Sequence, residues 1–501
     1  MDLDHNILAV VEPALMPTEI KIYAAGEEEG GDKITKQMGN IEPFIKVNKY
    51  VFGRNQVRSV DLTLSGVVPR CVVEVEDTKS GFEVDSYPRD GDVFTLLINS
   101  KNQETFKSIH MDFSITNIIA GKGVEGAPAL ITMEGIAKIP KLFGENCQKL
   151  DNAGSLDHME MVARELKLGL ATNIDETDDT MARIQAYETY LEFIKSIAED
   201  SYISDDAFQK YYIDQYYYLN YVEVNRIFNS SNPSIEELQQ SLASSSQSYG
   251  EKGNADGPDP DNAEMPLLLT NFLEVKGLNI YVEEVEIINN SNKISLKAGN
   301  KRNVMIYDDN GEDSERLQQF DIEPLSSTNL RDIEEPLKGK RDEEDYQDNV
   351  KYKYIGRQDT GEDGLGNVHS SSVFAKLHNK QNEMETQKMK VKVTLNSFNP
   401  ALYKYQKIPL LMYHYDGQKI GHATLTKMEH EEAGFNEQGL GLKSEDTGEG
   451  QPSQMMDRFL TGFYIIENID ITYDSTVGLT QEVTLIRREW PTKMADLRTP
   501  E

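Results

Sequence analysis

The chain has few cysteines, few basic residues and no long apolar run, and each shortage excludes a class of protein. Cys71 and Cys147 are the only cysteines. Two cysteines are too few for a disulfide framework, so we expect the chain to fold in a reducing compartment. No apolar run approaches the ~18 residues of a membrane-spanning helix, and residues 1–5 lack the basic region of a signal peptide. The sequence therefore predicts neither a membrane span nor a signal peptide.

Acidic residues outnumber basic ones by a wide margin. Lys and Arg total 51 against 85 Asp and Glu, which gives a formal net charge of −34. A protein that binds nucleic acid through its phosphates needs clustered basic residues, and none stand out here. We therefore expect no specific nucleic-acid binding, because an acidic surface repels DNA. The length of 501 residues suggests three or four domains of roughly 150 residues each.

The sequence carries no recognisable catalytic constellation. None of the eight histidines lies in a His-Glu-x-x-His pattern, neither cysteine lies in a Cys-x-x-Cys pattern, and there is no Gly-x-Ser-x-Gly elbow or P-loop. We therefore predict no catalytic, cofactor-binding or metal-binding residue and no cofactor. Two weak metal patterns stay open, one of histidines and one of acids without the EF-hand order of ligands. Their residues are His414, His422, His430 and Glu431, and Asp256, Asp259, Asp261, Asp308, Asn310 and Glu312.

The clearest structural signal is a hairpin near the carboxyl end, over residues 459–491. Between Phe463 and Tyr473, apolar residues fall on one parity and largely polar residues on the other. Because side chains alternate across a strand, this pattern predicts a strand with one apolar face. Residues 474–478 predict a turn, and residues 481–488 predict the partner strand.

A similar hairpin occurs earlier, over residues 113–140. Asn117 matches Asn468 and Pro140 matches Pro491, both at an offset of 351 residues, so we expect the two hairpins to align without a gap. Similar segments precede each hairpin, namely residues 71–76, Phe82 and residues 93–99 in the first copy, and residues 391–395, Phe398 and residues 408–415 in the second. We interpret them as two copies of one small β-barrel-like domain. The alternative is that any two hairpins in an all-β region look this similar.

The region between the copies predicts mixed structure. Apolar residues at helical spacing predict a helix over residues 155–166, closed by Gly169, and a second helix over residues 181–198 with Asp178 and Asp179 near its amino end. Residues 211–228 contain six tyrosines and predict a strand pair packed on that helix or at a subunit contact. The alternative is an aromatic platform that stacks bases or sugars.

The predicted fold class is α+β and β-rich, with two similar tube-forming β-barrel domains, an inserted α/β region and long acidic loops. Residues 370–377 predict a return to sheet, and residues 308–348 and 427–456 predict acidic surface loops. The expected divisions are an N-terminal extension (1–48), a first tube-type β-barrel domain (49–150), a helical or α+β insertion (151–228), a flexible linker (229–264), a β-rich segment with an acidic loop (265–375) and a second tube-type β-barrel domain (376–501).

Three segments carry a resemblance to a known family. Residues 69–140, 193–228 and 389–491 resemble, in order and texture, the baseplate hub proteins of contractile-tailed bacteriophages, which are related to the base of type VI secretion spikes. The resemblance implies two tube-forming β-barrel domains with inserted α/β material, and it brings no catalytic residues. It implies a virion protein of the tail baseplate, assembled in the host cytoplasm. The implied partners are the tail tube protein, the central spike protein and other baseplate proteins.

Duplication by itself points to a ring. Three chains with two similar domains each present six quasi-equivalent units, so a homotrimer matches a six-fold tail tube on one side and a three-fold spike on the other. DNA would pass through the acidic lumen without sticking. Alternatives are another baseplate or tube-completion component, a tail-associated carbohydrate- or peptidoglycan-degrading enzyme that uses the tyrosine-rich segment, and a host-surface binding module.

Overall fold

The computed structural model describes twenty-two stretches of the chain. They are residues 7–20, 41–53, 55–77, 82, 87–89, 91–100, 108–121, 129–204, 207–230, 268–269, 282–290, 302–308, 317–322, 349–355, 375–376, 379–380, 382–383, 386–387, 389–399, 402–415, 454–456 and 460–487.

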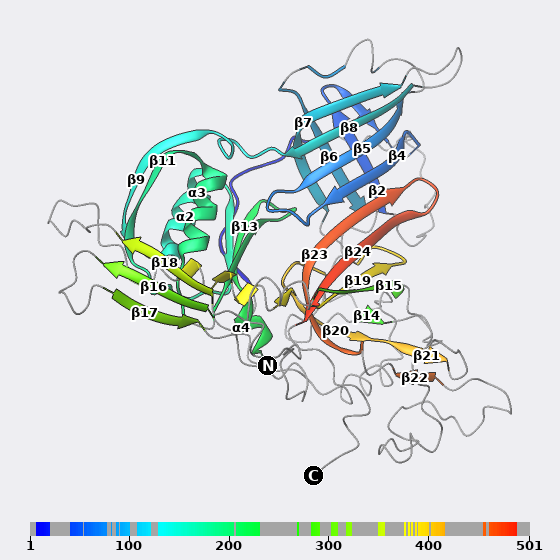
Figure 1. Ribbon diagram of the computed structural model, residues 1–501. Coiled ribbons are helices and arrows are strands. Elements are labelled where there is room, and N and C mark those ends of the chain that lie inside the picture. Colours follow the sequence, from blue (N-terminus) through cyan, green and yellow to red (C-terminus); the bar gives the residue numbers. More distant parts are fainter. Residues whose placement is uncertain are drawn as a thin grey trace, which may run out of the picture.

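One large sheet of thirteen strands dominates this structure (Figure 1). Eleven strands follow one another in the order β15-β19-β24-β23-β4-β5-β8-β7-β6-β2-β3, while β20 pairs with β23 and β14 with β20. The β-rich character predicted from the sequence is confirmed. The strands are β2 (Ile41–Val47), β3 (Tyr50–Phe52), β4 (Val57–Thr63), β5 (Arg70–Asp77), β6 (Val93–Ser100), β7 (Ile109–Gly121), β8 (Ala129–Ala137), β14 (Leu268–Leu269), β15 (Val282–Asn289), β19 (Met389–Leu395), β20 (Lys407–Leu411), β23 (Gly462–Asp474) and β24 (Gly478–Arg487).

Eight of these strands form two four-stranded units that follow each other in the sheet. The first unit is β4-β5-β8-β7 and the second is β15-β19-β24-β23, so the sheet order repeats itself. Within the first unit Leu62 of β4 lies opposite Cys71 of β5, and within the second Ile287 of β15 lies opposite Val391 of β19. Both strand pairs shift register at the same position, between Val57 and Ser59 in β4 and between Val282 and Glu284 in β15.

The hairpin of each unit repeats the same pattern. Ile115 lies opposite Gly135 in the first unit, and Ile466 lies opposite Leu485 in the second. Because a bulge is a specific local feature of a strand pair, its recurrence at matching sites fixes the correspondence between the units. The bulges lie between Ile115 and Asn117 in β7 and between Ile466 and Asn468 in β23.

The gap-free alignment of the two hairpins is wrong by one residue along the second strand. The first strands correspond at an offset of 351, as predicted, but Gly135 corresponds to Leu485 at an offset of 350. The connection causes the difference. Eight residues separate the paired Gly121 and Leu130, whereas seven separate the paired Thr472 and Thr480.

A fifth pair of strands also corresponds, and beyond it the copies diverge. In the first copy Val93 of β6 pairs with Ser114 of β7, and in the second Lys407 of β20 pairs with Ile465 of β23 at the corresponding position. The next strand is antiparallel β2 in the first copy but parallel β14 in the second. In the first copy β2 also approaches β4, so the sheet curls round its core (Figure 1).

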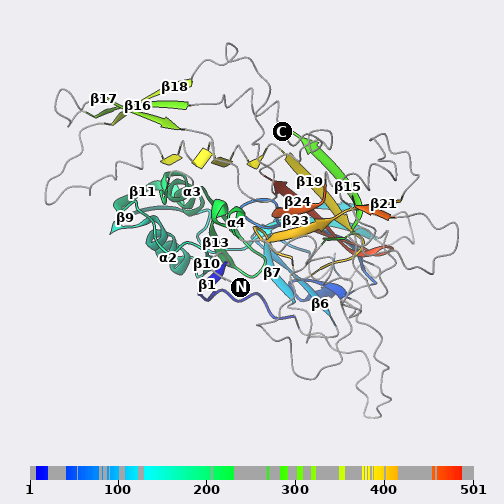
Figure 2. The same cartoon turned by 90° about the horizontal axis from the view of Figure 1, so that it is seen from below.

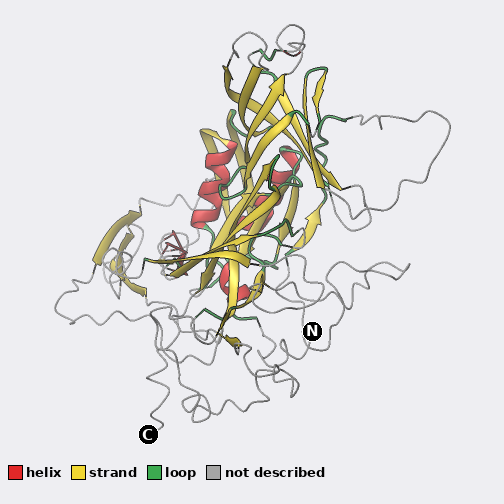
Figure 3. Cartoon of the chain, turned by 90° about the vertical axis from the view of Figure 1, so that its right-hand side faces the viewer, coloured by secondary structure: helices red, strands yellow, loops and turns green. Residues whose placement is uncertain are grey.

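A separate module follows the first copy along the chain. Strands β9 (Glu145–Ala153) and β11 (Met181–Thr189) pair with each other. A four-stranded sheet has the order β1-β10-β13-β12, and helices α2 and α3 pack together beside the strands (Figure 3). The bounds are β1 (Leu8–Val11), β10 (Gly169–Thr172), β12 (Gln209–Ile213), β13 (Tyr218–Glu223), α2 (Ser155–Glu165), α3 (Tyr190–Asp200) and α4 (Val224–Phe228).

The helix predicted over residues 181–198 is wrong in its first half, because β11 occupies it. The helix begins only after Thr189, whose hydroxyl accepts a hydrogen bond from the backbone N–H of Glu192 while the Glu192 carboxylate accepts one from the backbone N–H of Thr189. Asp179 serves the other helix instead. Its carboxylate accepts from the backbone N–H of Ser155, at 3.0 Å, at the start of α2.

Four further predictions from the sequence can be compared with the observed elements. The strand pair over residues 211–228 is confirmed as β12 and β13, of which β12 packs on α3 and β13 on α2, although the segment ends in α4. Gly169 opens β10 rather than closing a helix, and Ala375 and Lys376 are helical rather than extended. Each predicted acidic loop contains a strand, because pairing satisfies backbone groups. Within residues 308–348 the strand is β17 (Leu317–Ile322), which forms a small sheet, set apart in Figure 2, with the flanking strands β16 (Arg302–Asp308) and β18 (Asn349–Ile355). Within residues 427–456 it is β22 (Gln454–Met456), which pairs with β21 (Tyr413–Tyr415). Most of the linker over 229–264 lies outside the described residues.

Gly135 tests how tightly the first copy is packed. A Cβ at this position would lie 2.6 Å from Cε1 of Phe94 and 2.9 Å from Cβ of Phe113. We expect Gly135→Ala to lower the free energy of unfolding by roughly 1–3 kcal/mol, because the two rings have no room to move. Urea unfolding measures the change. Gly121→Ala, where the nearest atom lies at an ordinary 3.7 Å, is the control, and equal stability of both variants would contradict the packing described.

Candidate assembly surface

The two four-stranded units join edge to edge through β23 and β4. Leu62 lies opposite Ile471 and Val60 opposite Tyr473, and all four side chains are buried. Beyond the ladder, the backbone N–H of Ser475 donates to the carbonyl of Arg58 at 2.9 Å. The junction therefore combines a β-ladder with an apolar core that neither unit completes alone.

A buried lysine fastens the second copy to the turn that follows β4. The Nζ of Lys404 donates to the carbonyl oxygens of Leu64 at 2.9 Å and Gly66 at 3.4 Å, and it lies 4.4 Å from the ring centre of Tyr212. Burial lowers the pKa of Lys404 to about 8, although the negative charge of nearby Glu467 opposes the shift. One side chain thus links the first copy, the second copy and the inserted module.

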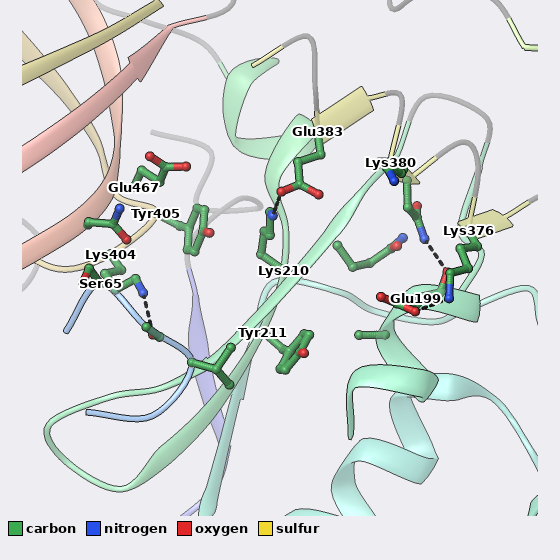
Figure 4. Close-up of a pocket in the computed structure, with 16 residues that line it drawn as sticks. Ser65, Glu199, Lys210, Tyr211, Lys376, Lys380, Glu383, Lys404, Tyr405 and Glu467 are labelled. Carbon is green, nitrogen blue, oxygen red and sulfur yellow. Dashed lines mark hydrogen bonds and ion pairs between the residues drawn. The ribbon is translucent and has the colours of Figure 1, made fainter. Parts of the chain in front are cut away.

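A cavity of about 520 Å³ lies beside this lysine (Figure 4). Ion pairs cross its walls, Lys210 with Glu383 and Lys376 with Glu199. Small-molecule pockets are usually apolar with a few polar groups, whereas this cavity is lined by charged groups of both signs. Its ion pairs therefore hold α3, β12 and residues 375–383 together, which is a structural role.

The face of the sheet opposite the core runs across both units and is acidic. Its side chains alternate with the buried ones along β4, β5, β8, β19 and most of β24. Three of its basic residues are engaged in ion pairs, Lys390 with Glu467 at 2.6 Å, Lys392 with Glu482 at 2.7 Å, and Arg58 with Glu76. Further acids on this face are Asp61, Glu74, Glu134, Glu284, Glu286, Asp470 and Asp474.

The eight strands end in two edges that have no partner among the described strands. At one end β15 pairs only with β19. At the other end, β6 pairs with β7 up to Ser114, so residues 117–121 of β7 pair only with β8. An unpaired strand edge presents N–H and C=O groups ready for another strand. These edges and the acidic face are the surfaces through which the chain can assemble.

The remaining sequence-predicted sites do not come together. Tyr212, Tyr217 and Tyr221 are buried in the module, so they cannot form a stacking platform. In the described part of the chain no three His, Cys, Asp or Glu residues are grouped as metal ligands. The weak metal patterns lie outside the described residues, except that the backbones of His414 and Asp308 belong to β21 and β16. Both cysteines are free.

Residues 121–126 carry the glycine spacing of a dinucleotide-binding loop, in the segment Gly-Lys-Gly-Val-Glu-Gly. That loop requires a following helix, and here the next described element is the strand β8, so the spacing is coincidental.

No helix in the described ranges has the length and apolar character needed to span a membrane.

Comparison with known proteins gives structural likeness only. No protein-family model matches the chain, and no curated protein matches it. The 43 kDa tail protein of prophage MuSo2 from Shewanella oneidensis has a TM-score of 0.47 and 10% identity, over 89% of this chain and 98% of that one. A tail protein from Neisseria meningitidis has a TM-score of 0.46 and 9% identity, over 89% and 97%.

A third similar structure comes from a secretion machine. It is an Escherichia coli component of the type VI secretion system that exhibits structural similarity to the T4 tail proteins gp27 and gp5. Its TM-score is 0.37 and its identity 8%, over 93% of this chain and 80% of that one. The similar structures are thus phage tail proteins and a type VI secretion component, the classes that the sequence resemblance predicted.

Lys404 gives the junction a pH dependence. The folded pKa of about 8 lies below the ordinary value of 10.5, so between these values the unfolded chain binds more protons than the folded one. Stability from this group therefore rises with pH. We expect the wild type to gain roughly 2–3 kcal/mol over Lys404→Met between pH 7 and pH 10. Urea unfolding of both proteins at both pH values measures the difference. The titration of the tyrosines affects both proteins equally, so it cancels in the comparison. Equal changes in stability of the wild type and Lys404→Met would contradict the burial of the Lys404 charge.

Proposed function

We propose that the protein is a structural hub of a phage tail baseplate. In this role it forms a homotrimeric ring that adapts the six-fold tail tube to the three-fold central spike and lets DNA pass. The observation that carries the proposal is the repeated four-stranded unit, with matching registers and matching bulges, inside one chain. Three such chains present six equivalent units around one axis.

The parts that repeat and the parts that differ suit two different neighbours. The repeated units supply a six-fold surface for the tail tube protein. The module with α2 and α3 follows only the first copy, and β2 and β14 run in opposite senses beside otherwise matching strands. These features recur three times in a trimer, so they supply a three-fold surface for the spike and for other baseplate proteins. On this view residues 49–150 and 376–501 supply most strands of the two tube-forming β-barrel domains, β2 joins the first copy from residues 1–48, β14 and β15 join the second from residues 265–375, and 151–228 is an insertion.

The acidic face of the sheet suits a lumen through which DNA moves. Lys390 and Lys392 pair with Glu467 and Glu482, so these basic side chains are already neutralised. A surface on which acids outnumber the available cations releases few counterions from DNA and so holds it weakly. We assign this face to the inside of the ring. The protein's location in this proposal is the tail baseplate of the virion, which is assembled in the host cytoplasm.

The oligomeric state tests this proposal. We expect the purified chain alone to have three times the chain mass of 56.7 kDa by light scattering, or its complex with the spike partner to contain three copies of the chain. Electron micrographs of the same sample should show a ring with a central hole. A chain that stays monomeric with the spike partner present would contradict the hub, and so would a trimer without a hole.

A further inference from the structure

The junction inside the chain shows how one unit of this kind joins the next. Strand β4, at one edge of the first unit, pairs with β23, at the opposite edge of the second unit. By the registers above, β15 is the counterpart of β4 and β7 is the counterpart of β23. The two edges that have no partner among the described strands are therefore the same two kinds of edge that already pair within the chain.

Exposure of the corresponding residues supports this reading. Leu62 of β4 is 1% exposed because β23 covers it, while its counterpart Ile287 of β15 is 43% exposed. On the other side, Ile471 of β23 is 2% exposed, and its counterpart Ala120 of β7 is exposed. Ile287 and Ala120 thus remain in solvent where their counterparts at the internal junction are buried.

We propose that residues 117–121 of β7 in one copy of this chain pair antiparallel with β15 of the next copy. The internal junction sets the register. Asp470 pairs with Thr63, Ile471 with Leu62 and Thr472 with Asp61. Moving the first member of each pair back by 351 residues and the second forward by 225 gives Ile119 opposite Ile288, Ala120 opposite Ile287, and Gly121 opposite Glu286.

Charge is compatible with this contact. Residues 117–121 read Asn-Ile-Ile-Ala-Gly and carry no charged side chain. Strand β15 presents Glu283, Glu284 and Glu286. Like charges directly opposite each other would destabilise a ladder, and none meet in this register. The acidic face would continue from one copy into the next, with Ile119 and Ile288 opposite each other on it at the contact.

The contact is heterologous, because different edges of the two copies meet. Such contacts close into a ring when the rotation allows and otherwise build an open filament. That three copies close the ring rests on the proposed function, whereas the pairing of the two edges rests on the internal junction. The two can therefore fail separately.

Cysteine pairs test the register in the full-length chain, with Cys147→Ser to remove the exposed native thiol. Directly opposed residues in an antiparallel ladder have Cα atoms about 4.5–5.5 Å apart, which suits a disulfide. We expect Ala120→Cys with Ile287→Cys to give covalent trimers on oxidation, seen on non-reducing gels. Ile119→Cys with Ile287→Cys is the matched control, because its thiols point to opposite faces and should not cross-link.

Each outcome decides one of the two proposals. Covalent trimers from the first pair alone support the edge pairing and the three-chain ring. Trimers by light scattering without this cross-link overturn the edge pairing and leave the hub standing. Cross-linked species of open-ended length support the edge pairing and overturn the closed ring, and a chain that stays monomeric with its spike partner present overturns both.

A charge at the edge tests the same contact without cross-linking. We expect Ile287→Lys to raise the concentration at which the trimer dissociates at least ~10-fold, because it replaces buried apolar area with a charge. Met161→Lys on α2, where the methionine is 47% exposed, is the matched control and should leave dissociation unchanged. Circular dichroism confirms that both variants fold. Unchanged assembly of Ile287→Lys would overturn the pairing.

Discussion

The pairing of β23 with β4 is the constraint on which the rest of the structure depends. It places two copies of a four-stranded unit side by side in one sheet, so that one core runs beneath both. Leu62 and Ile471 are buried only because the two units meet. Separating the copies would expose these side chains and a row of backbone hydrogen-bonding groups, and both are costly in water. The junction therefore fixes the orientation of one copy relative to the other.

The inserted module is held where the two copies meet. Lys404 bonds to the turn after β4 and lies over Tyr212 of β12, and Lys407 donates to the carbonyl oxygens of Phe228 at 3.0 Å and Ser230 at 2.7 Å. An apolar cluster with Phe463 and Ile465 packs α4 and β12 against the second copy. The part of the chain that does not repeat is thus anchored at the junction of the two copies.

Much of the β-structure was predictable because its signal is local. Alternation along residues 463–473 depends only on which side chains face a core, so the carboxyl-terminal hairpin could be placed from sequence. The helix at residues 181–198 failed because Met181 and Ile194 fit both a helical and an extended pattern. The capping box at Thr189 and pairing with β9 decided between them. The one-residue offset in the second hairpin was missed because turn length is not visible in a comparison of matching residues alone.

The sequence by itself determined the acidic charge, the lack of a catalytic pattern, and the order and recurrence of the hairpins, since these depend on residue identity and short spacing. Only the tertiary structure decided that β23 pairs with β4, which edges remain without a partner, and that Lys404 is buried at the junction. Residues 62 and 471 are far apart along the chain, and their contact depends on how two complete cores pack. No local pattern encodes that distance, so the assembly surface emerges only once the whole chain has folded.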